Sequence, residues 1–409
     1  MIISNLDLIR GGETVRAEAQ LKWEDSAHAP LPLFVQTDEV FGDALWPDGN
    51  SFLVASILAA WHGGEQRVRV DGSLCPALVN NLQGVFMMLQ AWYPQAFGSA
   101  PRIEATEGLR ASLPFGQGAV SLMSGGIDSL CLLRANRLFF PSGHPNGIKA
   151  VLSVAQSAQP LATKEALYKK MDGRLGAIRP VATEAVADVI PVVTNTWWLN
   201  PDGYFYGQKA YSSQLSAIVS FFSKRFHKGY IASSYDAAFT NKPWGSHPQL
   251  DAYYSSSHFQ MENSGTEMTR LRKVEIVADW PVALQHMRVC QNDNSGSKNC
   301  GTCEKCIRTM LMLEGFGKLR DSKAFPKNTI TPEIVRYLET YDMLHSDDPL
   351  HDEERLYLYG MIIPGLEKCG RNDLAATVKE ILSNLGTRKA KATAPGSQPS
   401  TTVGAGATA

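Results

Sequence analysis

The stretch AVSLMSGGIDSLCLL, Ala119 to Leu133, places two adjacent glycines between two apolar runs. This pattern predicts a strand that ends at Met123, a tight turn, and a helix that begins near Ser129. Gly125 and Gly126 allow positive φ angles and a close backbone approach to a ligand. The N–H groups at the start of a helix, with the positive end of its dipole, attract anions. We therefore predict a phosphate-binding loop made of Ser124, Gly125, Gly126, Ile127, Asp128 and Ser129.

Asp128 needs a separate explanation, because a carboxylate repels phosphate. It is expected to anchor Mg²⁺ or to orient the loop. The alternative interpretation is an ordinary strand-to-helix turn in which Asp128 or Ser129 is the N-cap. The loop has no lysine after its glycines and lacks the spacing G-x-G-x-x-G, so it matches neither of the two common phosphate-loop patterns.

From about residue 118 onward, predicted strands and helices alternate. Alternation of this kind predicts an α/β fold with a parallel sheet covered on both faces. Ligands bind such sheets beyond the carboxyl ends of the strands. The stretches VAQSAQ and SSYDAAFTNKPWGSHPQLD follow expected strands and are candidate site loops. The predicted strands are 118–123, 148–155, 188–196 and 228–235, and the predicted helices are 130–140, 163–178 and 210–226.

The remainder of the chain divides into three further regions. Residues 1–112 are predicted to form a small α+β module, with strands at 14–23, 31–36, 66–72 and 101–106 and helices at 51–62 and 76–93. Ser51 or Asn50 is the expected N-cap of the first helix, and Trp61 and Trp92 are expected in a core or interface. The module shows no catalytic constellation, so a docking or shaping role is expected. A phosphate-loop domain (113–316), a helical region (317–386) in which Thr331 caps a helix at Pro332, and a disordered tail (387–409) follow.

Four of the seven cysteines cluster in the stretch CQNDNSGSKNCGTCEKC. Their C-x9-C-x2-C-x2-C spacing is typical of a closed, structural Zn²⁺ site. An iron–sulfur cluster and free thiols are the alternatives. The predicted ligands are Cys290, Cys300, Cys303 and Cys306.

Composition limits the classes of function. The chain has 409 residues, of which 44% are hydrophobic and 19% charged, with a formal net charge of −1. This charge gives no indication of a nucleic-acid partner. The first residues lack the pattern of a signal peptide, and no apolar run approaches the length of a membrane span. We therefore expect a cytoplasmic protein without membrane contact, with a homodimer as one option.

The pattern S-G-G-x-D-S resembles the PP-loop of the N-type ATP pyrophosphatases. Together with the cysteine spacing, residues 118 to 315 resemble the 7-cyano-7-deazaguanine synthase (QueC-like) family. The resemblance implies an enzyme that uses ATP and Mg²⁺, cleaves ATP between the α and β phosphates, and adenylates a carboxylate. The acceptor is then 7-carboxy-7-deazaguanine or a related small molecule, converted to an amide or nitrile. QueC-like proteins with extra domains also occur in antiphage defence, where the partner is a protein.

Between the two motifs the chain departs from the family. The family's Gly-Arg-Asn matches Gly207-Gln208-Lys209, and its Gly-x-Asn-x-x-Asp matches a stretch with Ser233, Ser234 and Asp236. Lys209 is expected to neutralise the α-phosphate, or to be a solvated surface lysine. Asp236 is expected to contact Mg²⁺ or ribose, or to be a turn residue. The resemblance thus implies the catalytic candidates Asp128, Lys209 and Asp236.

The loop that replaces the family's substrate loop carries four further candidates: Lys242, Trp244, His247 and Asp251. His247 is a candidate general base for an incoming amine, although most lone histidines have no such role. Arg308 is expected to pair with Glu304 four residues before it.

Two other functions remain open. A PP-loop tRNA sulfurtransferase needs a spare persulfide cysteine and a basic RNA-binding surface. A non-catalytic nucleotide-binding scaffold needs only the loop and the zinc site.

Overall fold

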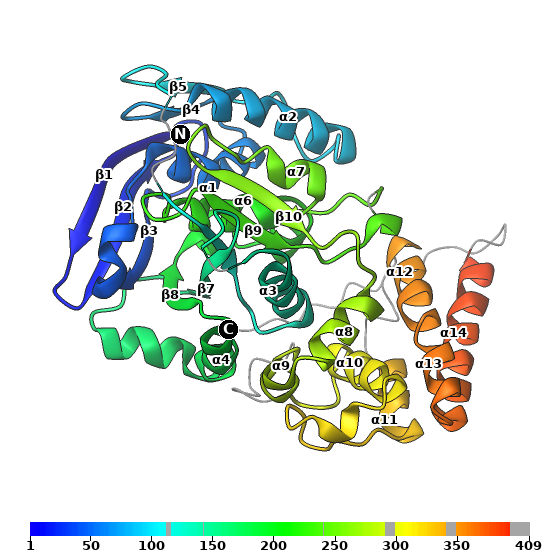
Figure 1. The fold of residues 1–409 in the computed structure, drawn as a ribbon. Coiled ribbons are helices and arrows are strands. Elements are labelled where there is room, and N and C mark those ends of the chain that lie inside the picture. The colour runs from blue at the N-terminus through cyan, green and yellow to red at the C-terminus, as the bar shows by residue number, and fades with distance from the viewer. Residues whose placement is uncertain (112–115, 142, 240, 291–298, 341–348, 393–409) are drawn as a thin grey trace. The chain divides into compact units, whose positions relative to one another are not determined.

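The computed structural model describes residues 1–111, 116–141, 143–239, 241–290, 299–340 and 349–392. The chain forms two compact units, of which the first comprises residues 1–300 and 321–326 and the second 301–320 and 327–409. The first unit contains a ten-stranded, mostly parallel sheet in the order β10-β9-β6-β7-β8-β3-β2-β1-β4-β5 (Figure 1). The predicted α/β class is thereby confirmed.

One half of this sheet is entirely parallel. It consists of β6 (Ala119–Leu122), β7 (Ile148–Gln156), β8 (Asp188–Thr194), β9 (Lys228–Ala232) and β10 (Gln260–Ser264). Helices α3 (Ile127–Phe139) and α4 (Lys164–Glu184) connect β6 to β7 and β7 to β8. Helix α6 (Tyr211–Ser220) leads back across the sheet to β9, so right-handed crossovers place it on the opposite face from α3 and α4. The strand order reverses between β6 and β9, and a ligand crevice is expected at the carboxyl ends of these two strands.

The other half of the sheet is formed by residues 1–105. Its strands are β1 (Ile2–Arg10), β2 (Thr14–Lys22), β3 (Leu31–Asp38), β4 (Arg67–Val70) and β5 (Arg102–Ala105). Strand β3 pairs antiparallel with β8, from Val35 opposite Thr194 to Thr37 opposite Val192. Although we expected residues 1–112 as a module of their own, their strands continue the sheet of the phosphate-loop region.

Two helices accompany this half of the sheet. Helix α1 (Gly49–His62) is buried along nearly its whole length and packs against α6. Helix α2 (Pro76–Trp92) begins at the expected proline. The predicted cap of α1 was wrong: the N-cap is Asp48, whose side chain accepts a hydrogen bond from the N–H of Asn50. Ser51 is instead buried inside the helix, where its hydroxyl accepts a hydrogen bond from Ser220.

The rest of the first unit supports the carboxyl ends of the parallel strands. Helix α5 (Gly203–Phe205) continues into a π-helical turn, Tyr206–Ala210, immediately before α6. Three further helices are α7 (Pro248–Ala252), α8 (Arg270–Ala278) and α9 (Pro281–His286).

The second unit is helical in its described residues. It contains α10 (Glu304–Gly315), α11 (Pro332–Arg336), α12 (Pro349–Gly360), α13 (Ile363–Lys368) and α14 (Asn372–Ala392). Thr331 is the N-cap of α11 and Pro332 its first residue, as predicted. Arg308 pairs with Glu304 at 3.1 Å, also as predicted. Helix α14 extends past residue 387, where we expected a disordered tail, and residues 393–409 of that tail lie outside the described residues.

Candidate functional site

The predicted phosphate loop lies between β6 and α3. Gly125 has a φ of +81°, a conformation that L side chains rarely adopt, which explains the glycine. The helix begins at Ile127, two residues earlier than expected, with Gly126 as its N-cap and no side-chain cap. Neither Asp128 nor Ser129 is therefore the N-cap that an ordinary turn would use. Gly126 offers no side chain to the first-turn N–H groups of α3, which is the arrangement that suits an anion.

The two serines of the loop bond within it. The N–H of Gly126 donates to Ser124 Oγ at 3.2 Å, and Ser129 Oγ donates to the Gly126 carbonyl at 3.0 Å. The two hydroxyl oxygens lie 3.4 Å apart. These bonds hold the turn in a fixed shape before any ligand binds.

Two cations that we did not predict lie beside Asp128. Its carboxylate contacts the guanidinium of Arg270 at 2.9 Å and the ammonium of Lys273 at 3.5 Å. Both residues belong to α8, where their spacing of three residues places them on one face of the helix. The sequence shows that Arg270 and Lys273 share a helix face, but it does not show that this face contacts the loop. These contacts favour a loop-orienting role for Asp128 over a direct Mg²⁺ anchor.

Lys273 also links the loop to the end of β9. Its ammonium donates to the Ser233 carbonyl at 2.7 Å, and burial lowers the pKa of Lys273 although Asp128 opposes that shift. Asp236 lies just beyond, where its carboxylate accepts a hydrogen bond from the N–H of Ala238 at 3.0 Å. The ends of β6 and β9 thus meet at the strand-order reversal. The expected Mg²⁺ or ribose contact of Asp236 stays a prediction.

The π-helical turn carries Lys209, a residue that is only 4% exposed. The alternative of a solvated surface lysine is therefore excluded. Its ammonium lies over the rings of Tyr93 and Tyr204, at 4.9 and 4.4 Å from their centroids. Burial raises the pKa of the neighbouring Tyr211, and the negative charges of Asp128 and Asp251 add to that shift. Tyr211 therefore lies within electrostatic reach of the phosphate loop.

The loop of residues 241–247, which we expected to face the substrate, packs tightly on this turn. A Cβ atom on Gly245 would lie 2.6 Å from the carbonyl oxygen of Gly207, so no larger residue fits there. Asp251 is fully buried and accepts hydrogen bonds from Ser246 Oγ, the His247 N–H and Asn263 Nδ2. Burial raises its pKa. Asp251 therefore fixes the position of the loop through its hydrogen bonds to Ser246 and His247.

His247 is the N-cap of α7, because its Nδ1 accepts a hydrogen bond from the N–H of Gln249 at 3.2 Å. Its ring packs edge-on against Trp92 at 5.1 Å, so this tryptophan lies at an internal contact, as we expected. Trp61 is buried and stacks on Phe97, also as expected. The capping bond occupies Nδ1 of His247, and its role as a general base stays a prediction.

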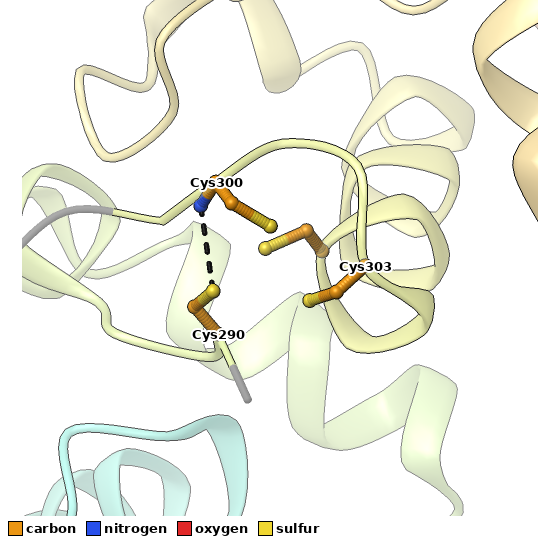
Figure 2. A group of neighbouring side chains, drawn as sticks. Cys290, Cys300 and Cys303 are labelled. Atoms are coloured by element: carbon orange, nitrogen blue, oxygen red, sulfur yellow. Dashed lines mark hydrogen bonds between the residues drawn. The ribbon is translucent and has the colours of Figure 1, made fainter. Parts of the chain in front are cut away.

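The four clustered cysteines meet as predicted. Their sulfur atoms all lie within 4.8 Å of one another. Figure 2 shows the side chains of Cys290, Cys300 and Cys303 pointing toward a common centre, with the N–H of Cys300 donating to the sulfur of Cys290 at 3.4 Å. Four thiolates around one Zn²⁺ at about 2.3 Å would lie about 3.8 Å apart. The cluster therefore fits a metal ion such as zinc.

Comparison of the chain with protein-family models, with curated proteins and with solved structures gives no match in any of the three. Among the described residues, no helix combines the length and the apolar character needed to cross a bilayer.

Proposed function

We propose that this protein uses ATP to adenylate a carboxylate, with release of pyrophosphate, and that a nitrogen nucleophile then takes the acyl group. The observation that carries the proposal is the phosphate loop with its flanking cations. The uncapped start of α3, the positive φ of Gly125 and the pair Arg270 and Lys273 converge on one point. Two cations against the one charge of Asp128 leave a net positive site for phosphate.

The chemistry balances without a redox partner. A carboxylate oxygen attacks the α-phosphorus, the bond from that phosphorus to the β-bridging oxygen breaks, and pyrophosphate leaves with the bond's electrons. The nitrogen nucleophile then attacks the acyl carbon and loses a proton, and AMP leaves with the former carboxylate oxygen. Arg270 and Lys273 would stabilise the charge on the leaving pyrophosphate. The Mg²⁺ that accompanies ATP would neutralise phosphate charge, with Asp128 and Asp236 as the nearby carboxylates.

The cysteine beside the loop gives no support to a sulfur-transfer role. Cys131 is the cysteine nearest the loop in sequence, and burial raises the pKa of its thiol to about 12. A thiol with that pKa is almost wholly protonated at neutral pH and is a poor carrier of persulfide sulfur. The four clustered cysteines would hold Zn²⁺ as a closed, structural site.

The decisive experiment measures whether a carboxylate oxygen of the acceptor is transferred to AMP. The protein is incubated with ATP, Mg²⁺, an ammonium salt and 7-carboxy-7-deazaguanine labelled with ¹⁸O in its carboxylate. We expect AMP and pyrophosphate, with one ¹⁸O atom transferred to AMP. A parallel assay of isotope exchange between pyrophosphate and ATP needs only the adenylation step.

Arg272→Met is the matched control variant, because Arg272 is on the same helix as Arg270 but is exposed and pairs with Glu275. A panel of other carboxylates, including proteins that carry exposed carboxyl termini, distinguishes a small-molecule acceptor from a protein acceptor. Formation of ADP and phosphate, or AMP without ¹⁸O, would contradict the proposal.

A further inference from the structure

The segment that leads into the cysteine cluster is bonded to the phosphate loop. The N–H of Arg288 donates to the Gly125 carbonyl at 2.8 Å. A Cβ atom on Gly125 would lie 3.4 Å from the Cβ atom of Arg288, so the two backbones are in contact. Arg288 precedes Cys290, the first cysteine of the cluster, by two residues. The loop and the start of the cluster therefore adjoin, although they are far apart in the sequence.

The bond to Arg288 fixes the direction of one N–H group in the loop. A peptide unit is planar and trans, so its C=O and N–H point in opposite directions. The Gly125 carbonyl points to Arg288, and the N–H of Gly126 in the same peptide unit points to Ser124 Oγ, at 3.2 Å. Two adjacent glycines offer little resistance to rotation of this unit. Without the bond to Arg288, rotation would turn a carbonyl oxygen, which repels anions, toward the place where we expect phosphate.

Asn299 anchors the backbone on either side of this arginine. Its side chain is 1% exposed, and all of its hydrogen-bonding capacity is used. The Oδ1 atom accepts from the N–H groups of Val289 and Cys290, at 2.8 and 3.1 Å. The Nδ2 group donates to the carbonyls of Met287 and Ala324, at 2.9 and 2.8 Å. Asn299 therefore determines where the segment 287–290 lies.

Asn299 also connects this segment with the second cysteine of the cluster, because Cys300 is the next residue. Cys290 and Cys300 both belong to the first unit. The N–H of Cys300 donates to the sulfur of Cys290 at 3.4 Å (Figure 2). A metal ion bound to these two sulfurs would join the segments on both sides of Asn299. Removal of the ion would leave individually weak hydrogen bonds to hold them together.

We propose that metal binding at the cysteine cluster and phosphate binding at the loop strengthen each other, with Asn299 as the positioning residue that links the two sites. With the cysteines bound to a metal ion, Asn299 and the segment 287–290 are held in place, and the Gly125 carbonyl stays turned toward that segment. Coupling between two binding sites is reciprocal, so bound phosphate should raise the affinity for the metal by the same factor. That the phosphate belongs to ATP rests on the proposed function, whereas the attachment of the loop to the cysteine segment does not.

The first test needs no nucleotide. Hydrogen–deuterium exchange is followed by mass spectrometry in peptides that cover the phosphate loop and strand β7, before and after zinc is removed with a chelator. We expect exchange at residues 125–130 to become about 5-fold faster and exchange in β7 to stay unchanged, because only the loop is bonded to the segment 287–290. Equal acceleration in both peptides would mean that the metal stabilises the unit as a whole, and it would overturn the inference.

Asn299→Ala tests the link while zinc is present. It should accelerate exchange in the loop by a similar factor, because it releases the segment 287–290. Asn195→Ala is the matched control, since Asn195 is also 1% exposed and bonds the Phe34 N–H and the Pro32 carbonyl. Strands β7 and β8 separate these partners on β3 from β6, so Asn195→Ala should leave exchange in the loop unchanged.

Melting temperatures of both variants identify any general loss of folding. If Asn299→Ala does not fold, zinc removal from the wild-type chain decides the question.

The second test measures the coupling itself. Its probe is α,β-methylene-ATP with Mg²⁺, which cannot be cleaved between the α and β phosphates. Isothermal titration calorimetry should show about 10-fold weaker binding to the zinc-free chain than to the zinc-bound chain. Competition with a chromophoric chelator should show zinc affinity raised by the same factor when the nucleotide is bound.

Two further results would overturn the inference: exchange in the loop that does not respond to zinc removal or to a folded Asn299→Ala variant, or nucleotide affinity that is the same with and without zinc. Failure of the proposed function is seen separately, as a chain that binds no nucleotide although its loop responds to zinc. The coupling is then measured with inorganic pyrophosphate as the probe, and equal affinities with and without zinc would again contradict it.

Discussion

The predicted phosphate loop (residues 124–129) and the surroundings of Lys209 differ in how the chain builds them. The loop is one continuous stretch whose hydroxyls and backbone groups bond to each other within six residues. The surroundings of Lys209 join a residue after α2, one from α5, the π-helical turn and a glycine from the loop 241–247. A local site is visible as a motif, whereas an assembled site depends on contacts between distant segments.

The largest effect is expected from the two cations of α8, Arg270 and Lys273, which lie beside the loop but far from it in the sequence. Arg270→Met or Lys273→Met should reduce pyrophosphate release by roughly 100-fold, because each removes one of two cations at the phosphate loop. The measurement is the steady-state rate of AMP formation, with Arg272→Met retaining the wild-type rate. Equal rates in all three variants would mean that the loop acts alone.

A second local motif is the cysteine cluster. Cys303→Ser should lose about one bound zinc per chain and lower the free energy of unfolding by about 3–5 kcal/mol, because a structural metal stabilises only the folded state. Zinc is measured by elemental analysis, and stability by denaturant titration. Cys369→Ser, outside the cluster and exposed, should change neither quantity.

The packing of the loop 241–247 against the π-helical turn is tested at Gly245, where the two backbones come closest. Gly245→Ala should destabilise the protein by about 1–3 kcal/mol, because the new Cβ would lie 2.6 Å from the Gly207 carbonyl oxygen. Gly207→Ala is the control, since a Cβ at that position meets no atom within 4 Å. Thermal unfolding of both variants measures the difference, and equal melting temperatures would show that the loop is not held against the turn.

The smallest expected effect is on how the free energy of unfolding depends on pH. Burial lowers the pKa of Lys209 from its ordinary value of 10.5, so between the two pKa values the folded chain binds fewer protons than the unfolded chain. Stability attributable to Lys209 therefore rises with pH across that interval. Lys209→Met should be more stable than the wild type at neutral pH, and its advantage should shrink as pH approaches 10.5.

Lys228→Met should change the pH dependence of the free energy of unfolding in the opposite direction. Burial would lower the pKa of Lys228, but its hydrogen bond to Glu262 and nearby charges outweigh burial and raise it. The stabilisation is present below the unfolded pKa and is lost as pH rises through the folded one. Denaturant titrations at several pH values between 7 and 11 compare the two variants, and parallel curves would contradict the opposite directions of the two pKa shifts.

The sequence predicted what is local. Strands β2 to β9, the two helices of residues 1–112 and the four-cysteine cluster all follow from patterns within about twenty residues. Strand β1 was missed because its alternation is interrupted near Asn5, where φ is +54° and the register to β2 shifts. Strand β10 was missed because its sequence, QMENS, is mostly polar.

The site was predicted only in part for the same reason. Nothing near Asp128 in the sequence indicates Arg270 or Lys273, since tertiary packing brings α8 to the loop. Tyr93 and Tyr204 look like ordinary exposed aromatics in the sequence, and only the fold places them on either side of an ammonium. Asp251 was singled out from its place in the substrate-facing loop, and the structure shows it fully buried, where it holds that loop through hydrogen bonds.

The pairing of β3 with β8 has a consequence for how this chain can be divided. A fragment that begins after residue 112 would lose β3, and the backbone N–H and C=O groups of β8 that face it would be left open to solvent. An uncovered strand of that kind recruits strands from other copies, so the fragment should self-associate instead of behaving as a free-standing domain. In this protein residues 1–112 are inseparable from the parallel half of the sheet, because the two halves share one continuous ladder of hydrogen bonds.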